Sequence, residues 1–254
     1  MCLGECWFIN KELTLSICKA DNDPPLDKKN DKLPFPLPDK NFIWALIGKP
    51  RSGKTTYLIS LLSKRKSKGM RQSYRGLFEN VIFVSPSLQS LAGNKDIERL
   101  KYKFDNITLD VLDEICEICQ KNRDDDKKTC IVFDDVSSQF KSNKLIIDKL
   151  SHMCKNHRHC FSSIFILAQK YTDLPTGMRT CVNYLTMFNT DNLMERDKIF
   201  SELPIRKENY DPLYEHIFQN KEDANDRHNS MLLDMSRTRF NRTRVFKNFN
   251  LLDF

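Results

Sequence analysis

Short apolar runs recur through the middle of the chain, and most of them end in a polar or small residue. They occupy residues 42–47, 81–84, 129–135, 162–169 and 183–188. Uninterrupted apolar runs of this length predict strands that are buried on both faces. Apolar residues at three- and four-residue spacing predict helices at 110–121, 143–155, 191–200 and 208–218. Because strands and helices alternate, the pattern predicts an α/β domain.

A glycine-rich segment follows the first apolar run and leads into a helical pattern. Its residues are Gly48, Lys49, Pro50, Arg51, Ser52, Gly53, Lys54, Thr55 and Thr56. They match the phosphate loop G-x-x-x-x-G-K-[ST] in its proper setting of strand, loop and helix. The segment therefore predicts a site for ATP.

Each residue type in this loop has a physical role. Gly48 and Gly53 let the backbone curl so that its N–H groups meet phosphate oxygens. The helix that starts near Lys54 directs its positive dipole end at the same anions. We expect Lys54 to reach the β- and γ-phosphates and Thr55 to place its hydroxyl on Mg²⁺.

Two adjacent carboxylates, Asp134 and Asp135, end the apolar run 129–135. A buried strand that ends in acids is the pattern of the Walker B motif, and hard cations prefer carboxylate ligands. We expect Asp134 to hold Mg²⁺ through its water shell and Asp135 to polarise the attacking water. The plain alternative is an acidic strand end near a turn.

The run 162–169 ends in the side-chain amide of Gln169. If its strand lies between the phosphate-loop strand and the strand of Asp134, Gln169 faces the γ-phosphate and can orient water or report the nucleotide's state. The alternative is a capping or loop amide. Arg179 follows on a short turn, where spacing alone predicts a solvated cation.

The cysteines fit packing better than metal chemistry. Cys116 and Cys119 lie on the apolar face of the predicted helix 110–121, which favours core packing over a C-x-x-C metal or redox site. Cys154, His157, His159 and Cys160 have the residue types of a zinc site, but their spacing matches no standard zinc pattern. Nine cysteines, an odd number, indicate free thiols and a reducing compartment.

The composition narrows the possible partners. The chain has 254 residues, 40% of them hydrophobic and 30% charged, with a formal net charge of +7. Such a charge favours a polyanionic partner. No apolar run approaches the roughly 20 residues that span a bilayer, and the N-terminal residues lack the core of a signal peptide.

Three regions are expected along the chain: an irregular leader at 1–40, a P-loop ATPase domain at 41–235 and a basic-aromatic tail at 236–254. The leader is rich in Pro, Asp and Lys. In the tail, basic residues alternate with aromatics. That pattern suits contact with phosphates and bases, and it equally suits a charged edge strand.

Taken together, these motifs resemble those of the FtsK/HerA superfamily, and within it the poxvirus-type genome-packaging ATPases of large DNA viruses, virophages and related elements. The resemblance rests on GKPRSGKT (48–55), IVFDDV (131–136), RH (158–159), ILAQK (166–170) and LPTGMR (174–179). It covers about residues 41–190. The strand end at Gln169 and the segment ending at Arg179 are its discriminating parts.

The resemblance implies a RecA-like P-loop NTPase core, with a mainly parallel sheet in the order 5-1-4-3-2 flanked by helices. It implies an ATP-hydrolysing translocase that forms a ring, usually a hexamer, and packages viral double-stranded DNA into a capsid. Gln169 matches the family's polar sensor, and Arg179 matches the arginine that acts on a neighbouring subunit. A capsid component is a further expected partner, and the host cytoplasm or the virion is the expected location.

Two readings from other classes stay open. A small-molecule kinase with a phosphate loop would act as a monomer and ignore DNA, but Asp134, Asp135 and Gln169 argue against it. A non-catalytic nucleotide-binding scaffold is disfavoured because the catalytic residue types are present as a set.

Overall fold

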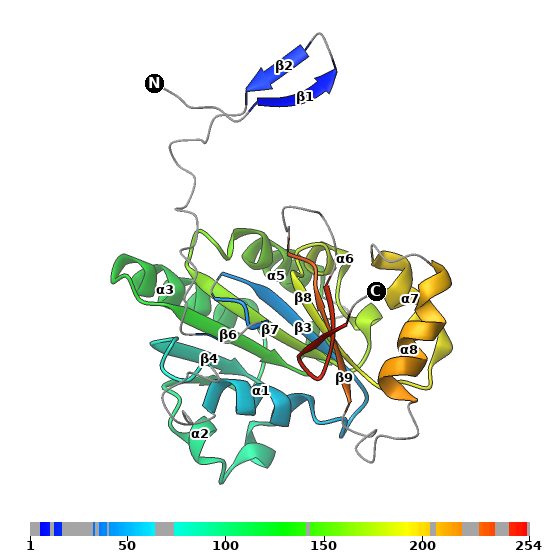
Figure 1. The fold of residues 1–254 in the computed structure, drawn as a ribbon. Coiled ribbons are helices and arrows are strands. Elements are labelled where there is room, and N and C mark those ends of the chain that lie inside the picture. Colours follow the sequence, from blue (N-terminus) through cyan, green and yellow to red (C-terminus); the bar gives the residue numbers. More distant parts are fainter. Residues whose placement is uncertain are drawn as a thin grey trace.

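Helices cover both faces of a twisted sheet in the computed structural model of this chain (Figure 1). The structure describes residues 6–10, 13–16, 33, 36–39, 41–63, 74–140, 143–203, 207–219, 229–236 and 244–252. Among these residues, no helix combines the length and the apolar character that a membrane crossing requires.

The strands are β1 (Cys6–Asn10), β2 (Leu13–Ser16), β3 (Ile43–Ile47), β4 (Asn80–Val84), β5 (Tyr102–Phe104), β6 (Thr129–Asp134), β7 (Ser162–Ala168), β8 (Tyr184–Phe188), β9 (Ser230–Asp234), β10 (Arg244–Lys247) and β11 (Asn250–Leu252). The helices are α1 (Lys54–Ser63), α2 (Lys95–Glu98), α3 (Leu109–Asp124), α4 (Ser137–Phe140), α5 (Lys144–Asn156), α6 (Thr176–Arg179), α7 (Leu193–Glu202) and α8 (Tyr210–Phe218). Short 3₁₀ turns are η1 (Leu88–Leu91), η2 (Tyr171–Asp173) and η3 (Lys207–Asn209).

The main sheet has the strand order β11-β10-β9-β8-β3-β7-β6-β4-β5. Its centre, β8-β3-β7-β6-β4, is parallel throughout. Numbered from the phosphate-loop strand β3, this centre has the order 5-1-4-3-2, so the predicted topology is confirmed. The sheet is longer than predicted, because β5 adds a parallel strand at one edge while β9, β10 and β11 add antiparallel strands at the other.

The central strand β3 divides the core into two layers. Ile43, Ala45 and Ile47 pack into the cluster that includes α3, α5, α6, α7 and α8, whereas Trp44 and Leu46 pack into the cluster beneath α1. Figure 1 shows these helices on opposite faces of the sheet. Every residue of β3 is buried, because the strand has a helical layer on each side. This burial explains why its sequence shows no polar alternation.

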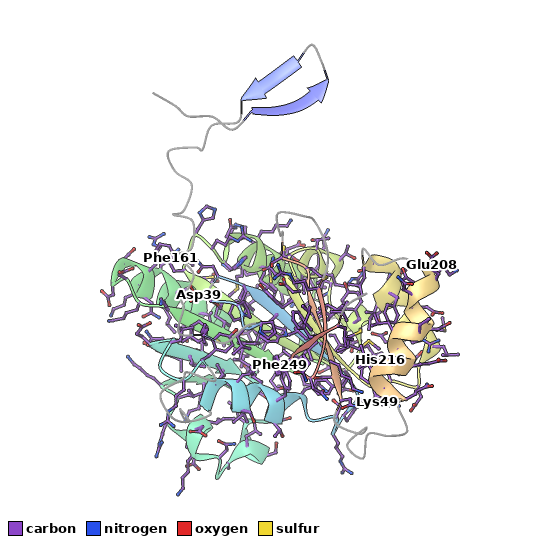
Figure 2. All side chains as sticks on the ribbon, viewed as in Figure 1. Asp39, Lys49, Phe161, Glu208, His216 and Phe249 are labelled. Atoms are coloured by element: carbon purple, nitrogen blue, oxygen red, sulfur yellow. The ribbon has the colours of Figure 1, made fainter. Side chains whose placement is uncertain are left out.

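The expected leader and tail both contain strands. In the leader, β1 and β2 pair antiparallel. In the tail, β10 and β11 join the main sheet, and Phe246 is fully buried. Phe249, which is labelled in Figure 2, follows β10, and its ring stacks on Tyr57 of α1 at 5.4 Å between ring centroids. Residues 237–243, which carry most of the basic-aromatic alternation, lie outside the described residues. The boundaries at 40 and 235 stay predictions.

Candidate active site

The three predicted strand ends meet at one edge of the sheet. Strand β7 pairs with β3 on one side and with β6 on the other, as the hypothesis for Gln169 required. The register places Ile47 beside Ala168, and Leu167 beside Asp134. Since parallel strands share their carboxyl edge, the phosphate loop, the acid pair and Gln169 emerge side by side.

Close packing fixes the start of the phosphate loop. The backbone N–H of Gly48 donates to the carbonyl of Ala168 at 3.2 Å, which ties the loop to β7. A Cβ atom on Gly48 would lie 2.6 Å from Ser52 Oγ and 2.9 Å from Phe188 Cβ, so only glycine fits there. Gly53 has a φ of +95°, the left-handed region that glycine adopts without strain. The local backbone therefore requires both glycines of the motif.

Lys54 is folded over the loop it belongs to. Its ammonium donates to the carbonyl oxygens of Gly48 at 2.6 Å and Lys49 at 2.9 Å, and the residue is only 8% exposed. Burial lowers the pKa of Lys54, while the charges of Asp135 and Asp134 oppose this shift. The ammonium thus lies inside the loop and within the field of both carboxylates.

Asp134 faces the first turn of α1. Thr55 Oγ1 donates to its carboxylate at 3.3 Å, and Ser85 Oγ donates to the same group at 3.4 Å. Asp134 is 5% exposed, and burial raises its pKa, opposed by the hydrogen bond from Thr55. The structure thus brings together both residues that the sequence predicts for Mg²⁺.

Asp135 and Gln169 are in direct contact. Gln169 Nε2 donates to Asp135 Oδ2 at 2.8 Å across the edge between β6 and β7. Asp135 has a φ of +53°, and its backbone N–H donates to the carbonyl of Leu167 at 3.1 Å. The left-handed backbone turns the second carboxylate away from the strand direction and toward the amide.

Arg179 is engaged elsewhere, at the end of α6. Its guanidinium forms a two-point ion pair with Glu202, with Nε 3.1 Å from Oε2 and Nη2 3.2 Å from Oε1. Nη1 also donates to the carbonyl of Leu174 at 2.8 Å. Among the described residues, none of the contacts of Arg179 joins it to Lys54, Asp134, Asp135 or Gln169. A role in this chain's own site has no support in the described geometry.

Three residues that contact the predicted site residues were not predicted from the sequence. Ser85 follows the neighbouring strand β4, and its position at a strand end was a usable signal. Asp191 pairs with Lys49 of the phosphate loop, and Glu202 pairs with Arg179. Those two contacts join segments far apart in the sequence, so no local pattern marks them.

The residues present suit a nucleotide with a magnesium ion. Ser52 Oγ is a buried hydroxyl with no hydrogen-bond partner among the described residues, and it lies next to Gly48 in the phosphate loop. Thr55 and Asp134 supply the oxygen ligands that Mg²⁺ prefers. An anion on the loop would satisfy the Ser52 hydroxyl and offset the Lys54 charge.

A metal site at Cys154, His157, His159 and Cys160 has no support in the geometry. Both ring nitrogens of His157 face backbone carbonyls, of Cys154 at 2.7 Å and of Asn41 at 2.9 Å. Across the part of the chain that the structure describes, no group of three or more His, Cys, Asp or Glu side chains is arranged to hold a metal ion. His157 instead ties the end of α5 to the entry of β3.

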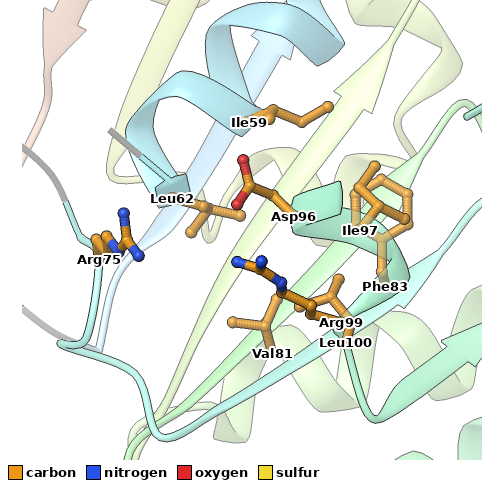
Figure 3. Close-up of a pocket in the computed structure, with 9 residues that line it drawn as sticks. All are labelled: Ile59, Leu62, Arg75, Val81, Phe83, Asp96, Ile97, Arg99 and Leu100. Carbon is orange, nitrogen blue, oxygen red and sulfur yellow. The ribbon is translucent and has the colours of Figure 1, made fainter. Parts of the chain in front are cut away.

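A separate cavity of about 220 Å³ lies beside α1 and β4 (Figure 3). It is lined by Ile59, Leu62, Arg75, Val81, Phe83, Asp96, Ile97, Arg99 and Leu100. It shares no residue with the loop, Asp134, Asp135 or Gln169, so it is not part of the candidate active site.

Several solved structures share the fold of this chain. The genome packaging NTPase B204 from Sulfolobus turreted icosahedral virus 2, in complex with sulfate, is 16% identical with a TM-score of 0.55, and the match covers 86% of this chain and 100% of that chain. Its complex with ATP-gammaS gives a TM-score of 0.52 at 16% identity, covering 84% and 98%. The pCW3 conjugation coupling protein TcpA gives 0.51 at 10% identity, covering 79% and 59%.

The family comparison agrees with the motifs. A search among curated proteins found no match. Residues 35–233, which include the phosphate loop, the acid pair, Gln169 and Arg179, match the family described as Poxvirus A32 protein. The resemblance to poxvirus-type packaging ATPases is thereby confirmed, and the chain belongs to the Poxvirus A32 protein family.

Proposed function

We propose that this chain hydrolyses ATP and uses the energy to move double-stranded DNA into a viral capsid. The observation that carries the proposal is the meeting of three groups at one sheet edge: Lys54 inside the phosphate loop, Thr55 against Asp134, and Gln169 against Asp135. Membership of the A32 family and the shared fold with a genome packaging NTPase support the same function.

The phosphate loop binds the triphosphate of the substrate. Lys54 exchanges its carbonyl partners for phosphate oxygens, and its positive charge stabilises the charge that builds up there. Thr55 and Asp134 would hold Mg²⁺, which neutralises phosphate charge when bound. The backbone N–H groups at the start of α1 bind the same anion.

Asp135 and Gln169 act on the attacking water. Asp135 accepts a proton or hydrogen bond from the water, and Gln169 fixes the orientation of that carboxylate through their 2.8 Å hydrogen bond. The left-handed backbone at Asp135 keeps the carboxylate beside the amide. We infer that both residues face the γ-phosphate, as their strand ends suggest.

Arg179 is proposed to act on the nucleotide of a neighbouring subunit, since it is bound to Glu202 in its own chain. Hydrolysis then depends on assembly into a ring, for which a hexamer is the expected form. The net charge of +7 favours DNA held through its phosphates, so binding should weaken steeply with salt. A capsid component as partner, and the host cytoplasm or virion as location, belong to the same proposal.

Phosphate release and oligomer size, measured with and without long duplex DNA, test this function. The expected result is an oligomer whose ATP hydrolysis rises with DNA, and a Lys54→Ala variant with no activity above background. A monomer that ignores DNA and phosphorylates a metabolite would indicate a kinase instead. ATP binding without turnover, in the presence of DNA, would indicate a scaffold. Full activity of Lys54→Ala would overturn the site itself.

A further inference from the structure

Helix α7 contacts both segments that follow β7 on the way to Arg179. Glu195, in the first turn of α7, is 6% exposed and accepts hydrogen bonds from the backbone N–H of Tyr171 and from Thr172 Oγ1. Glu202, the last residue of α7, pairs with Arg179. One helix therefore holds both the turn η2, which begins three residues after the end of β7, and the end of α6.

The guanidinium of Arg179 has an almost complete set of partners. Its Nε and one N–H of Nη2 donate to Glu202, the other N–H of Nη2 donates to Thr176 Oγ1 at 3.3 Å, and Nη1 donates once to Leu174. A guanidinium has five N–H donors, so four are engaged. Among the residues that the structure describes, the remaining N–H, on Nη1, has no acceptor. Because Glu202 holds two points of a planar group, it fixes the direction of that N–H.

Tyr171 lies between this ion pair and the end of strand β7, which Gln169 follows. The guanidinium of Arg179, which Glu202 holds, lies 5.3 Å from the centroid of the Tyr171 ring. Burial raises the pKa of Tyr171, and the contact with Glu202 raises it further. Tyr171 is two residues beyond Gln169 in the sequence, so its ring connects the strand end that bears Gln169 to the guanidinium of Arg179.

We propose that Glu202 positions Arg179 for its action on a neighbouring subunit, and that Tyr171 couples this pair to the strand end of Gln169. The inference rests on the proposed function, because it takes a neighbour's nucleotide as the target of Arg179. The oriented Nη1 donor is the group offered to a phosphate oxygen. Through Tyr171, the nucleotide state that Gln169 reports in one subunit changes the arginine that the next subunit receives.

Burial supports a fixed geometry. The side chains of Arg179 and Glu202 are 12% and 27% exposed, far less than the surface ion pairs of the chain such as Lys127–Asp125 at 48% and 46%. A two-point pair with this burial restricts the arginine to one orientation. If the pair served stability alone, its loss would not change turnover at a site in another subunit.

A mixed-subunit experiment tests this directly. One chain, Arg179→Ala, keeps its phosphate loop but offers no arginine; the other, Lys54→Ala, offers Arg179 but cannot hydrolyse ATP. Each should be inactive alone, and mixing them at saturating concentration with DNA should restore phosphate release. Glu202→Gln is then added to the Lys54→Ala chain. Turnover per Arg179→Ala chain should fall about tenfold, with KM for ATP unchanged, since the nucleotide is bound by the other subunit.

Two further variants of the arginine-donating chain serve as controls. Lys198→Gln removes the other ion pair of Glu202, 2.7 Å from its Oε1, and leaves Arg179 untouched, so turnover should not change. Glu202→Asp keeps the charge but shortens the side chain, and it should give intermediate turnover. Size measurements on each mixture show whether the two chains still assemble together. If Glu202→Gln does not assemble with its partner chain, the turnover of Glu202→Asp is used in its place.

The outcomes separate the two levels of the proposal. Failure of the two parent chains to complement each other would refute the action of Arg179 on a neighbour, and with it this inference. If the chain with Glu202→Gln restores as much turnover as the chain with intact Glu202, the positioning role of Glu202 is overturned, while the action of Arg179 on a neighbour stands. The same holds for Glu202→Asp where it replaces Glu202→Gln. An equal fall with Lys198→Gln would likewise overturn it, because Arg179 keeps Glu202 in that variant.

Discussion

Gln169 Nε2 lies 2.8 Å from Asp135 Oδ2, so the amide at the end of β7 restrains the second carboxylate at the end of β6. Only a parallel sheet with β7 beside β6 brings these two strand ends together, and the register places Leu167 next to Asp134. The proposed role of Asp135 in activating water requires a defined carboxylate direction, and this contact restrains it. The amide limits the directions the carboxylate can take.

Two substitutions at Asp135 distinguish the effect of its charge on activity from the effect of its left-handed backbone on stability. Asp135→Asn keeps a residue type that tolerates a φ of +53°, so stability should be unchanged while phosphate release falls at least about a hundredfold. Asp135→Ala should lose the same activity and also about 1 kcal/mol of stability, because alanine disfavours the left-handed region. Urea unfolding and phosphate release on both variants provide the check. Equal stability of the two would contradict the strain argument.

Replacing Gln169 should lower turnover through Asp135. In Gln169→Ala the carboxylate loses its orienting donor, so kcat should fall about tenfold while KM for ATP is unchanged. In the double variant with Asp135→Asn, the two losses should not add, because the amide acts through the carboxylate. Steady-state kinetics on the four proteins of this cycle decide the matter. Additive losses would mean that Gln169 contacts the reaction by itself.

The ionised side chain of Asp134 should lower the free energy of unfolding of the ligand-free protein at neutral pH. Burial raises its folded pKa above the unfolded value, and a raised carboxyl pKa favours folding at low pH and loses that advantage as the pH rises through the folded pKa. At pH 7, Asp134→Asn should therefore be more stable by about 1 kcal/mol without nucleotide or metal. Thermal unfolding across pH gives the measurement.

The same variant has two internal controls. Near pH 3, below the unfolded pKa of about 4, the carboxyl is protonated in both states and the stability gain should vanish. With Mg²⁺ and ATP present, the wild type should gain more stability than the variant, because Asp134 is proposed to hold the metal. A stability gain that does not depend on pH would point to a cause other than ionisation of Asp134.

The parts of the fold found from sequence are those with strong local signals. Strands β3, β4, β6, β7 and β8 are buried on two faces, so their apolar runs stand out. Strand β5 reads Tyr-Lys-Phe at the sheet edge and is only partly buried, which leaves no apolar run to detect. Strand β10 carries Arg244 and Lys247 around a buried pair, in the tail where the sequence suits a charged edge strand as well as nucleic-acid contact; in the sheet it lies between β9 and the edge strand β11.

In the candidate site, too, the residues predicted from sequence are those with strong local signals. Lys54, Thr55 and Asp134 stand in motifs whose spacing the backbone dictates, and the structure brings them together. The partners of Lys49 and Arg179, in contrast, come from the loop before α7 and from its last residue. Such contacts depend on where α7 docks, and the apolar spacing of a helix does not encode that position.

Gly48→Ala should damage the phosphate loop by overpacking. The new Cβ would meet Ser52 Oγ at 2.6 Å and Phe188 Cβ at 2.9 Å, and the second of these belongs to a buried strand that cannot move easily. Stability should fall by about 1–3 kcal/mol, and ATP affinity should fall with it. Ser52→Ala is the control, since it removes the hydroxyl without adding volume, and it should keep the fold. Denaturant unfolding and nucleotide titration measure both effects.

The buried thiols should react only when the protein unfolds. Burial raises the pKa of Cys119 and of Cys154 to about 12, and Cys130 is fully buried, so at pH 8 these thiols are protonated and shielded. A water-soluble alkylating reagent should label them in urea but not in the native protein, as read by mass spectrometry.

Cys116 and Cys160 test whether this protection comes from packing. They line the same cavity of about 100 Å³ as Cys119 but are only partly buried, so slow native labelling is expected there. A zinc chelator should leave both the labelling pattern and Tm unchanged, because packing and not a metal protects the thiols. Rapid native labelling of Cys119, or a chelator-induced drop in Tm, would show that this region is held together by something other than apolar contact.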